Sequence, residues 1–144
     1  MTYTPATGEA AIRQLLGDRV RAVTTKDVDA VAAQYDADAV MYDLAPPLQT
    51  RGVDRDAIRA WFDSYAGPIR CDTAQERVFV DGGVAFVHYL YRIRGTQTSG
   101  NEVDMWVRAT LGLRRQGDAW KIIHSHDSEP FDMKTFQALF DLQP

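Results

Sequence analysis

Long strand-like segments joined by tight turns fill the second half of the chain. They alternate apolar and polar residues and end at turn formers such as Asp81-Gly82-Gly83 and Gln116-Gly117-Asp118. Strands joined in this way pair as antiparallel neighbours, and the sheet that they form curls under its own twist. The predicted strands are Thr73–Val80, Val84–Arg94, Glu102–Arg114 and Ala119–Asp127.

Helical periodicity dominates the part of the chain before these strands. Apolar residues recur at helix spacing between Ala6 and Thr25, and Asp27 and Asp54 are typical N-caps of two further helices. A short strand, Ala39–Leu44, separates these two helices, and Asp132 is predicted to cap a final short helix with Phe136, Leu139 and Phe140. Helices followed by long strands predict an α+β fold. We expect a strongly curved antiparallel sheet wrapped around the N-terminal helices as a cone, with an apolar interior that holds a small ligand.

Composition narrows the possible partners and location. The 144 residues are expected to form a single domain, residues 1–144. A net charge of −4, with no more than two consecutive Lys or Arg residues, argues against nucleic acid, and no apolar run is long enough for a membrane span. The single cysteine, Cys71, excludes an internal disulfide, and no secretory leader is evident, so we expect a cytoplasmic protein.

The last predicted strand carries polar groups where a core strand would normally stay apolar. The sequence HSHD follows Ile122 and Ile123, and its histidines, His124 and His126, share one face of the strand. In a regular hairpin they lie opposite Leu111 and Ala109 and therefore face the interior. A β-bulge would exchange the two faces locally and turn Asp127 inward instead.

Several segments carry a family resemblance. They are YDADAV (residues 35–40), AIRAWF (residues 57–62), WVRAT (residues 106–110) and WKIIHSHDSEPF (residues 120–131). With them the chain resembles the superfamily of nuclear transport factor 2 (NTF2), the ketosteroid isomerases and the SnoaL-like polyketide cyclases. Its ending is similar to a subgroup with the motif His-x-His-x-Ser-x-Pro-Phe. The resemblance implies a cone-shaped NTF2-like, or cystatin-like, roll that is usually a homodimer.

The comparison with ketosteroid isomerases extends to single positions. Asp43 falls where those enzymes keep their carboxylate base. Arg19 takes the place of the oxyanion-hole tyrosine, and the partner carboxylic acid falls near Thr110. Because two of the three groups differ, steroid isomerisation itself is not expected.

These residues lead to an expected site. Asp43 is expected to take a proton, while His126 or His124 protonates or polarises the developing oxyanion. Arg108 and Asp127 are interpreted either as a surface salt bridge or as an anchor for a carboxylate ligand. The candidate ligand-binding residues are Tyr42, Trp61, His88, Trp106, Arg108 and Asp127.

The sequence thus favours a cofactor-independent acid/base enzyme of isomerase, cyclase or hydrolase type. Its expected partner is a small apolar, cyclic or polyketide-like metabolite. No metal is expected, because two histidines on adjacent same-face positions still need a third ligand. The alternative is a non-catalytic ligand-binding or dimerisation module of the same fold.

Overall fold

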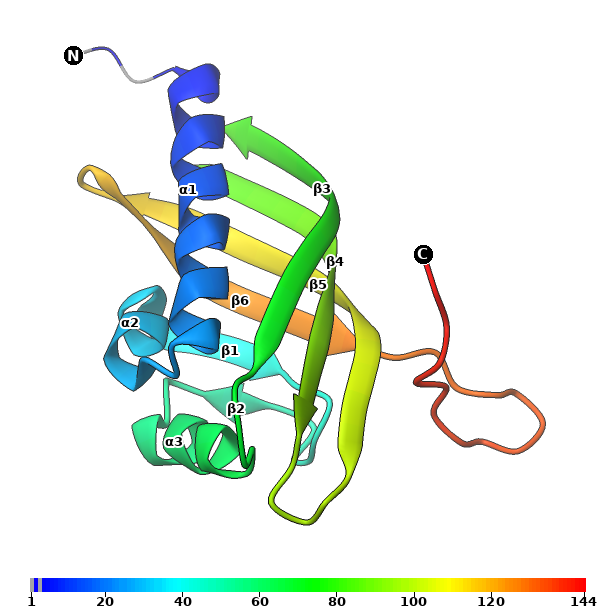
Figure 1. Cartoon of the computed structure of the whole chain (residues 1–144). Coiled ribbons are helices and arrows are strands. Elements are labelled where there is room, and N and C mark those ends of the chain that lie inside the picture. The colour runs from blue at the N-terminus through cyan, green and yellow to red at the C-terminus, as the bar shows by residue number, and fades with distance from the viewer. Residues whose placement is uncertain (1, 3) are drawn as a thin grey trace.

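The computed structural model describes residues 2 and 4–144 and confirms the predicted α+β architecture, with N-terminal helices on one side of a curved, open sheet (Figure 1). In chain order the elements are α1 (Pro5–Thr24), α2 (Val28–Ala33), β1 (Tyr35–Tyr42), β2 (Thr50–Arg51), α3 (Arg55–Asp63), β3 (Arg70–Asp81), β4 (Val84–Thr96), β5 (Glu102–Gln116) and β6 (Ala119–Ser128).

Each helix begins at a hydroxyl or carboxylate cap. The Thr4 side chain accepts from the Thr7 N–H at the start of α1. Asp27 and Asp54, the predicted caps, accept backbone N–H groups at the starts of α2 and α3. Within residues 2 and 4–144, none of the helices combines the length and the apolar character that a membrane crossing requires.

The sheet has the strand order β2-β1-β6-β5-β4-β3. Strands β3 to β6 form the predicted antiparallel meander. β1 is inserted beside β6 and runs parallel to it, and the short β2, which the sequence did not predict, extends the sheet beyond β1. This order places the C-terminal end of β1 next to the C-terminal end of β6.

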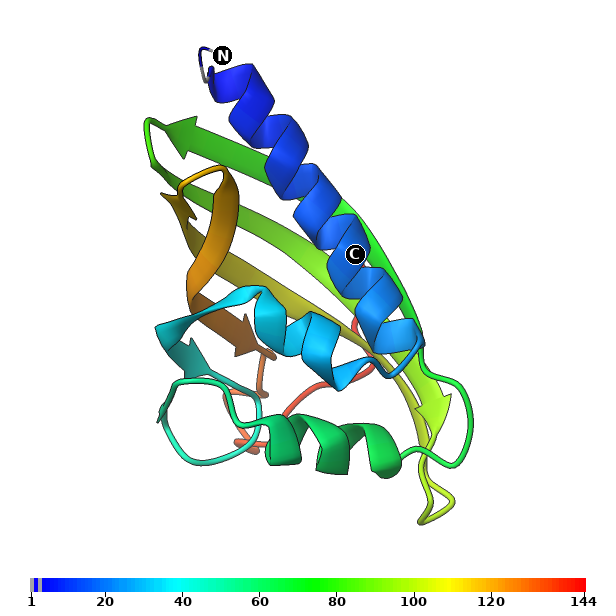
Figure 2. The same ribbon diagram turned by 90° about the vertical axis from the view of Figure 1, so that its left-hand side faces the viewer.

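The core lies between the helices and one face of the sheet, which we call the inner face (Figure 2). Ile12 and Leu16 of α1 pack on Val87 of β4 and on Leu111 of β5, and all four side chains are buried. A second cluster packs Phe62 and its neighbours against the other end of β4. Burial of this apolar surface holds α1 across the sheet.

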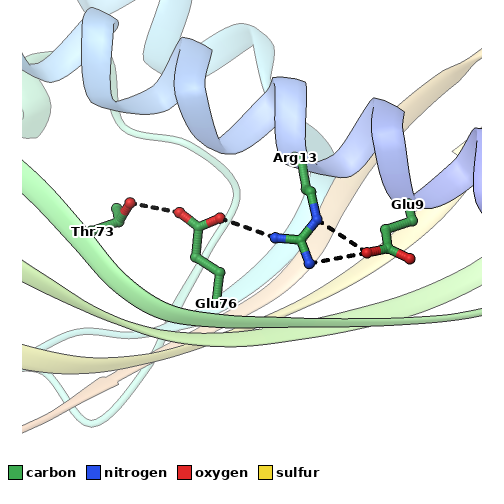
Figure 3. A network of polar contacts seen from close by, with 4 residues as sticks. All are labelled: Glu9, Arg13, Thr73 and Glu76. Atoms are coloured by element: carbon green, nitrogen blue, oxygen red, sulfur yellow. Dashed lines mark hydrogen bonds and ion pairs between the residues drawn. The ribbon is translucent and has the colours of Figure 1, made fainter.

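Ionic contacts attach α1 to the edge strand β3 (Figure 3). The Arg13 guanidinium lies 3.0 Å from a Glu9 oxygen and 3.4 Å from a Glu76 oxygen. Glu76 also accepts a hydrogen bond of 2.5 Å from the Thr73 hydroxyl. Glu76 lies at an irregularity of β3 between Ala74 and Arg77. Its carboxylate points toward α1, where it contacts Arg13.

The predicted C-terminal helix is wrong. Asp132 does act as a cap, but its carboxylate accepts the N–H groups of Lys134 and Thr135 within a turn that does not continue. Phe136 has φ 59°, a left-handed conformation that ends a right-handed helix. The segment 129–144, here called the C-terminal arm, has no helix and projects away from the rest of the chain (Figure 1).

Candidate active site

A β-bulge in the last hairpin decides which side chains of β6 face inward. Leu113 of β5 pairs with Ile122, but the preceding residue, Gly112, pairs with His124, so that Ile123 is the extra residue. Beyond the bulge, Asp127 lies opposite Ala109, a buried inner-face residue. The bulge alternative left open by the sequence is therefore the one that the structure adopts.

The expectation that the histidines face the interior is wrong, and the bulge is the reason. His124 and His126 pair with Gly112 and with the exposed Thr110, on the face of the sheet that the helices leave uncovered, which we call the outer face. His124 Nδ1 lies 2.7 Å from the backbone oxygen of Val40. The Tyr42 ring packs edge-on against both imidazoles, with centroid separations of 4.7 and 5.2 Å.

Asp127 takes their place on the inner face. Its Oδ2 accepts a hydrogen bond of 2.8 Å from the Tyr91 hydroxyl. Desolvation raises the pKa of Asp127, and the Tyr91 hydrogen bond and the Arg19 charge offset this only in part. The group is therefore a carboxyl that keeps its proton to a higher pH than a solvated aspartate does.

A cation from α1 reaches the same region. Arg19 Nη2 donates a 2.6 Å hydrogen bond to the Tyr35 hydroxyl, and the guanidinium carbon lies 5.2 Å from the Tyr35 ring centroid. Desolvation disfavours the charged form of Arg19, but Tyr35, Tyr89 and Asp127 together keep its pKa above the ordinary value. We call Arg19, Tyr35, Tyr89, Tyr91 and Asp127 the inner polar cluster.

The tyrosines of this cluster were not among the residues predicted from the sequence. Tyr89 and Tyr91 belong to the inner-face row of β4 that begins at Ala85 and ends at Ile93, and the alternation along β4 indicates their direction. Burial raises the pKa of both phenols well above the usual value, so both keep their protons at neutral pH, and the Tyr91 hydroxyl donates to Asp127. The sequence comparison noted Arg19 only because it takes the place of the oxyanion-hole tyrosine of ketosteroid isomerases.

Asp43 lies at the rim of the cluster. It follows Tyr42, the last residue of β1, which pairs with His126. Asp43 is exposed, and its charge is close enough to contribute to the raised pKa of Asp127. The exposed Asp43 and the desolvated Asp127 thus lie near each other.

The remaining candidate residues lie elsewhere. Arg108 is on the outer face and donates to the Ser128 hydroxyl at 3.0 Å, so its predicted salt bridge with Asp127 is wrong: the two side chains lie on opposite faces. Trp61 belongs to α3, where its ring packs on Phe62 and Tyr65. Tyr42, His88 and Trp106 occupy outer-face positions of their strands.

Two hollows lie away from Asp127 and Arg19. One, of about 670 Å³, runs between α1, α2 and the β5–β6 turn. The other, of about 570 Å³, lies over β3, β4 and β5; it is lined by the exposed Arg77, His88 and Arg108 and also by the buried Tyr89. Asp127 and Arg19 line neither hollow, so the predicted ligand-holding interior of the cone stays a prediction.

Comparisons with known proteins agree with this architecture. The SnoaL-like domain family matches residues 12–132. An NTF2-like protein of unknown function from Pseudomonas putida KT2440 is 36% identical, covers 99% of this chain and 100% of its own, and superposes with a TM-score of 0.83. A protein with a cystatin-like fold from Caulobacter vibrioides is 18% identical over 84% of this chain and 88% of its own, with a TM-score of 0.71.

A third structure of the same fold is a hexachlorocyclohexane dehydrochlorinase of type 2. It is 17% identical over 95% of this chain and 92% of its own, with a TM-score of 0.72. At this identity the likeness concerns the fold alone. No curated protein is similar enough in sequence to count as a relative.

Proposed function

The chain belongs to the SnoaL-like domain family, and from that premise we propose that it is a cofactor-independent acid/base enzyme. Its substrate is a small, largely apolar, cyclic or polyketide-like metabolite with a carbonyl group. The reaction moves a proton at a carbon next to that carbonyl, as an isomerase or a cyclase does.

One observation carries this proposal: a carboxyl and a guanidinium stand on the inner face, among side chains that a stable core would keep apolar. Asp127 and Arg19 lie within a shell of tyrosines rather than in bulk water. Burying such groups costs stability even when they are hydrogen-bonded. A substrate that needs both a proton acceptor and a positive charge is the simplest reason to keep them there.

The roles follow from the chemistry of the groups. Asp127, once ionised, takes the proton from carbon, and the electron pair of the broken C–H bond moves into an enolate. The raised pKa of Asp127 makes it a stronger base than a solvated aspartate. The positive charge of Arg19 stabilises the enolate oxygen, and the proton then returns to carbon. Asp43 at the rim serves as a second acid/base group.

Proton exchange tests this assignment before the natural substrate is identified. A panel of cyclic ketones and lactones is incubated with the protein in D2O, and exchange next to the carbonyl is followed by NMR. We expect Asp127→Asn to lower the exchange rate at least about 100-fold, the range of general base catalysis. Asp43→Asn is expected to lower the rate about tenfold, because its rim position supports a secondary role.

Two control variants separate this assignment from the histidine hypothesis. Asp104→Asn removes an exposed outer-face carboxylate that pairs with Arg92, and it is expected to exchange at the parent rate. His126→Ala is also expected to keep the parent rate, since the imidazole belongs to the outer face. An Asp127→Asn variant that exchanges as fast as the parent would contradict the proposal.

A binding module is the second candidate, and the environment of His124 favours it. The imidazole bonds to the Val40 backbone, as a purely structural histidine does. If members of the panel bind, seen as NMR shift changes, while none exchanges above the rate in buffer, the module replaces the enzyme.

A further inference from the structure

Tyr91 is the side chain that holds the carboxyl of Asp127 in place. Its hydroxyl donates a hydrogen bond of 2.8 Å to Oδ2 of Asp127. The two residues belong to β4 and β6, and β5 runs between these strands. The residue of β5 that lies opposite Asp127 is Ala109, whose single methyl group leaves room for the phenol to reach across the strand.

This hydrogen bond makes the two oxygens of the Asp127 carboxylate unequal. Oδ2 accepts from the Tyr91 hydroxyl, whereas Oδ1 accepts no hydrogen bond within residues 2 and 4–144. An oxygen that already accepts a hydrogen bond is a poorer proton acceptor than a free one, because part of its negative charge is neutralised by the donor. Oδ1 is therefore the oxygen that is available to a substrate.

We propose that Tyr91 is a positioning residue: it holds Oδ2 of Asp127, so that Oδ1 takes the proton from the substrate carbon and returns it, and it extends the activity to lower pH. This inference rests on the proposed function, in which Asp127 is the base. Tyr91 itself transfers no proton. Burial raises the pKa of its phenol well above the ordinary value, so the hydroxyl stays protonated while Oδ1 reacts.

The effect on pH follows from the charges around Asp127. Desolvation raises the pKa of Asp127, and the Tyr91 hydrogen bond is the largest of the influences that oppose it, because it favours the ionised form. Arg19 of α1 and His126 of β6 also lower this pKa, and Asp43 beyond β1 raises it. Without the Tyr91 hydroxyl, Asp127 would keep its proton to a higher pH and could not act as a base there.

An NMR titration tests the effect of Tyr91 on Asp127 without any substrate. The carboxyl carbons are labelled with 13C, and the signal that Asp127→Asn lacks is assigned to Asp127. Tyr91→Phe removes the hydroxyl and keeps the ring. We expect the acid dissociation constant of Asp127 to fall about tenfold or more in this variant, as the loss of a hydrogen bond to a charged group implies.

Tyr89→Phe is the matched control for the titration. Tyr89 is the preceding inner-face residue of β4 and is also buried, but its hydroxyl interacts with Arg19 and does not donate to Asp127. Tyr89→Phe should therefore leave the titration midpoint of Asp127 at the parent value. A shift as large as that in Tyr91→Phe would mean that any lost phenol moves the midpoint, and would contradict the specific role of Tyr91.

Proton exchange next to a carbonyl, measured over a range of pH, gives the second readout. Below the midpoint the rate follows the ionised fraction of Asp127, so Tyr91→Phe should exchange about tenfold more slowly than the parent there. The difference should become smaller at higher pH, where Asp127 is ionised in both proteins. A loss of structure would instead lower the rate by the same factor at every pH.

A fluorinated tyrosine keeps the test available if Tyr91→Phe does not fold. 3-Fluorotyrosine at position 91 has a more acidic hydroxyl and donates a stronger hydrogen bond. We expect it to move the midpoint of Asp127 below that of the parent, opposite to the effect of Tyr91→Phe. Circular dichroism verifies that each variant is folded.

The outcomes separate this inference from the proposed function. A midpoint that neither change at position 91 moves, or an exchange-rate ratio that is the same at every pH, would overturn the positioning role of Tyr91 even if the parent catalyses exchange. A midpoint that shifts as expected, in a parent that exchanges no compound faster than buffer does, would overturn the proposed function. The proton transfer to Oδ1 would then be wrong as well, and Tyr91 would only set the charge state of Asp127.

Discussion

A shift of one residue in β6 changes the chemistry of the site. With Ile123 as the extra residue, the carboxyl of Asp127 rather than the imidazole of His126 faces the helices. A carboxyl on this face meets Tyr91 and Arg19, which give it a hydrogen bond and an opposite charge. Its raised pKa shows that desolvation outweighs both.

This pKa predicts how Asp127→Asn changes stability with pH. A carboxyl with a raised folded-state pKa binds more protons in the folded than in the unfolded state, so its contribution to stability is present below the ordinary pKa of about 4 and is lost as the pH rises through the raised value. An asparagine at this position does not ionise, so the variant does not lose this stability as the pH rises. Relative to the parent, Asp127→Asn should therefore gain unfolding free energy between pH 4 and pH 7, as measured by urea denaturation.

Asp104→Asn provides a control of opposite sign. The hydrogen bond from Arg92 lowers the pKa of Asp104, so this carboxylate stabilises the fold above its ordinary pKa and stops doing so as the pH falls. Relative to the parent, the variant should therefore be less stable above the ordinary pKa of about 4, and this difference should shrink as the pH falls below 4. An Asp127→Asn variant that followed the same direction would contradict the raised pKa.

At the scale of elements, periodicity and caps predicted most of the fold. Alternation indicated the strands of the meander, and Asp27 and Asp54 marked the starts of α2 and α3. The bulge was not predictable, because Ile122 and Ile123 are both apolar and β-branched, and either one satisfies a core position. Only packing of Trp120 and Ile122 in the core selects the register.

In the C-terminal arm, helical periodicity predicted an element that does not form. Phe136, Leu139 and Phe140 have helical spacing, yet a helix of this length is stable only when its apolar face packs on a core. The arm projects away from the core of its own chain (Figure 1). Whether such a short segment forms a helix depends on tertiary contacts, which the local sequence does not reveal.

Two glycines test the packing of α1 and β4. A Cβ at Gly95 would lie 2.8 Å from a Tyr65 ring carbon and 3.2 Å from the Pro68 oxygen, so Gly95→Ala should lower the unfolding free energy by about 1–3 kcal/mol. A Cβ at Gly17 in α1 would meet nothing within 4 Å, and Gly17→Ala should raise the unfolding free energy by about 0.5–1 kcal/mol. Chemical denaturation measures both, and equal effects would refute the close approach of Tyr65 to β4.

For the whole molecule, the decisive contact joins segments far apart in sequence. β1 pairs in parallel with β6, although α3 and three strands of the meander separate them in the chain. This pairing brings Asp43 near Asp127. No local sequence pattern predicts the pairing. The resemblance to a family, rather than periodicity, is what predicted a site role for Asp43.

The reactivity of Cys71, the only cysteine, can be used to measure global unfolding. It lies on β3 beside the core cluster of Phe62, Ile69 and Ile93, and burial raises its pKa to about 11. Because the thiolate is the reactive form, a rise of the pKa from 9.0 to about 11 lowers the thiolate population at pH 8 roughly 100-fold. Modification by a disulfide reagent should therefore be at least about 100-fold slower in native buffer than in urea, and should accelerate with urea in parallel with global unfolding followed by circular dichroism. Cys71→Ser verifies that no other group reacts, and a native rate equal to the rate in urea would mean that β3 does not stay packed on the core.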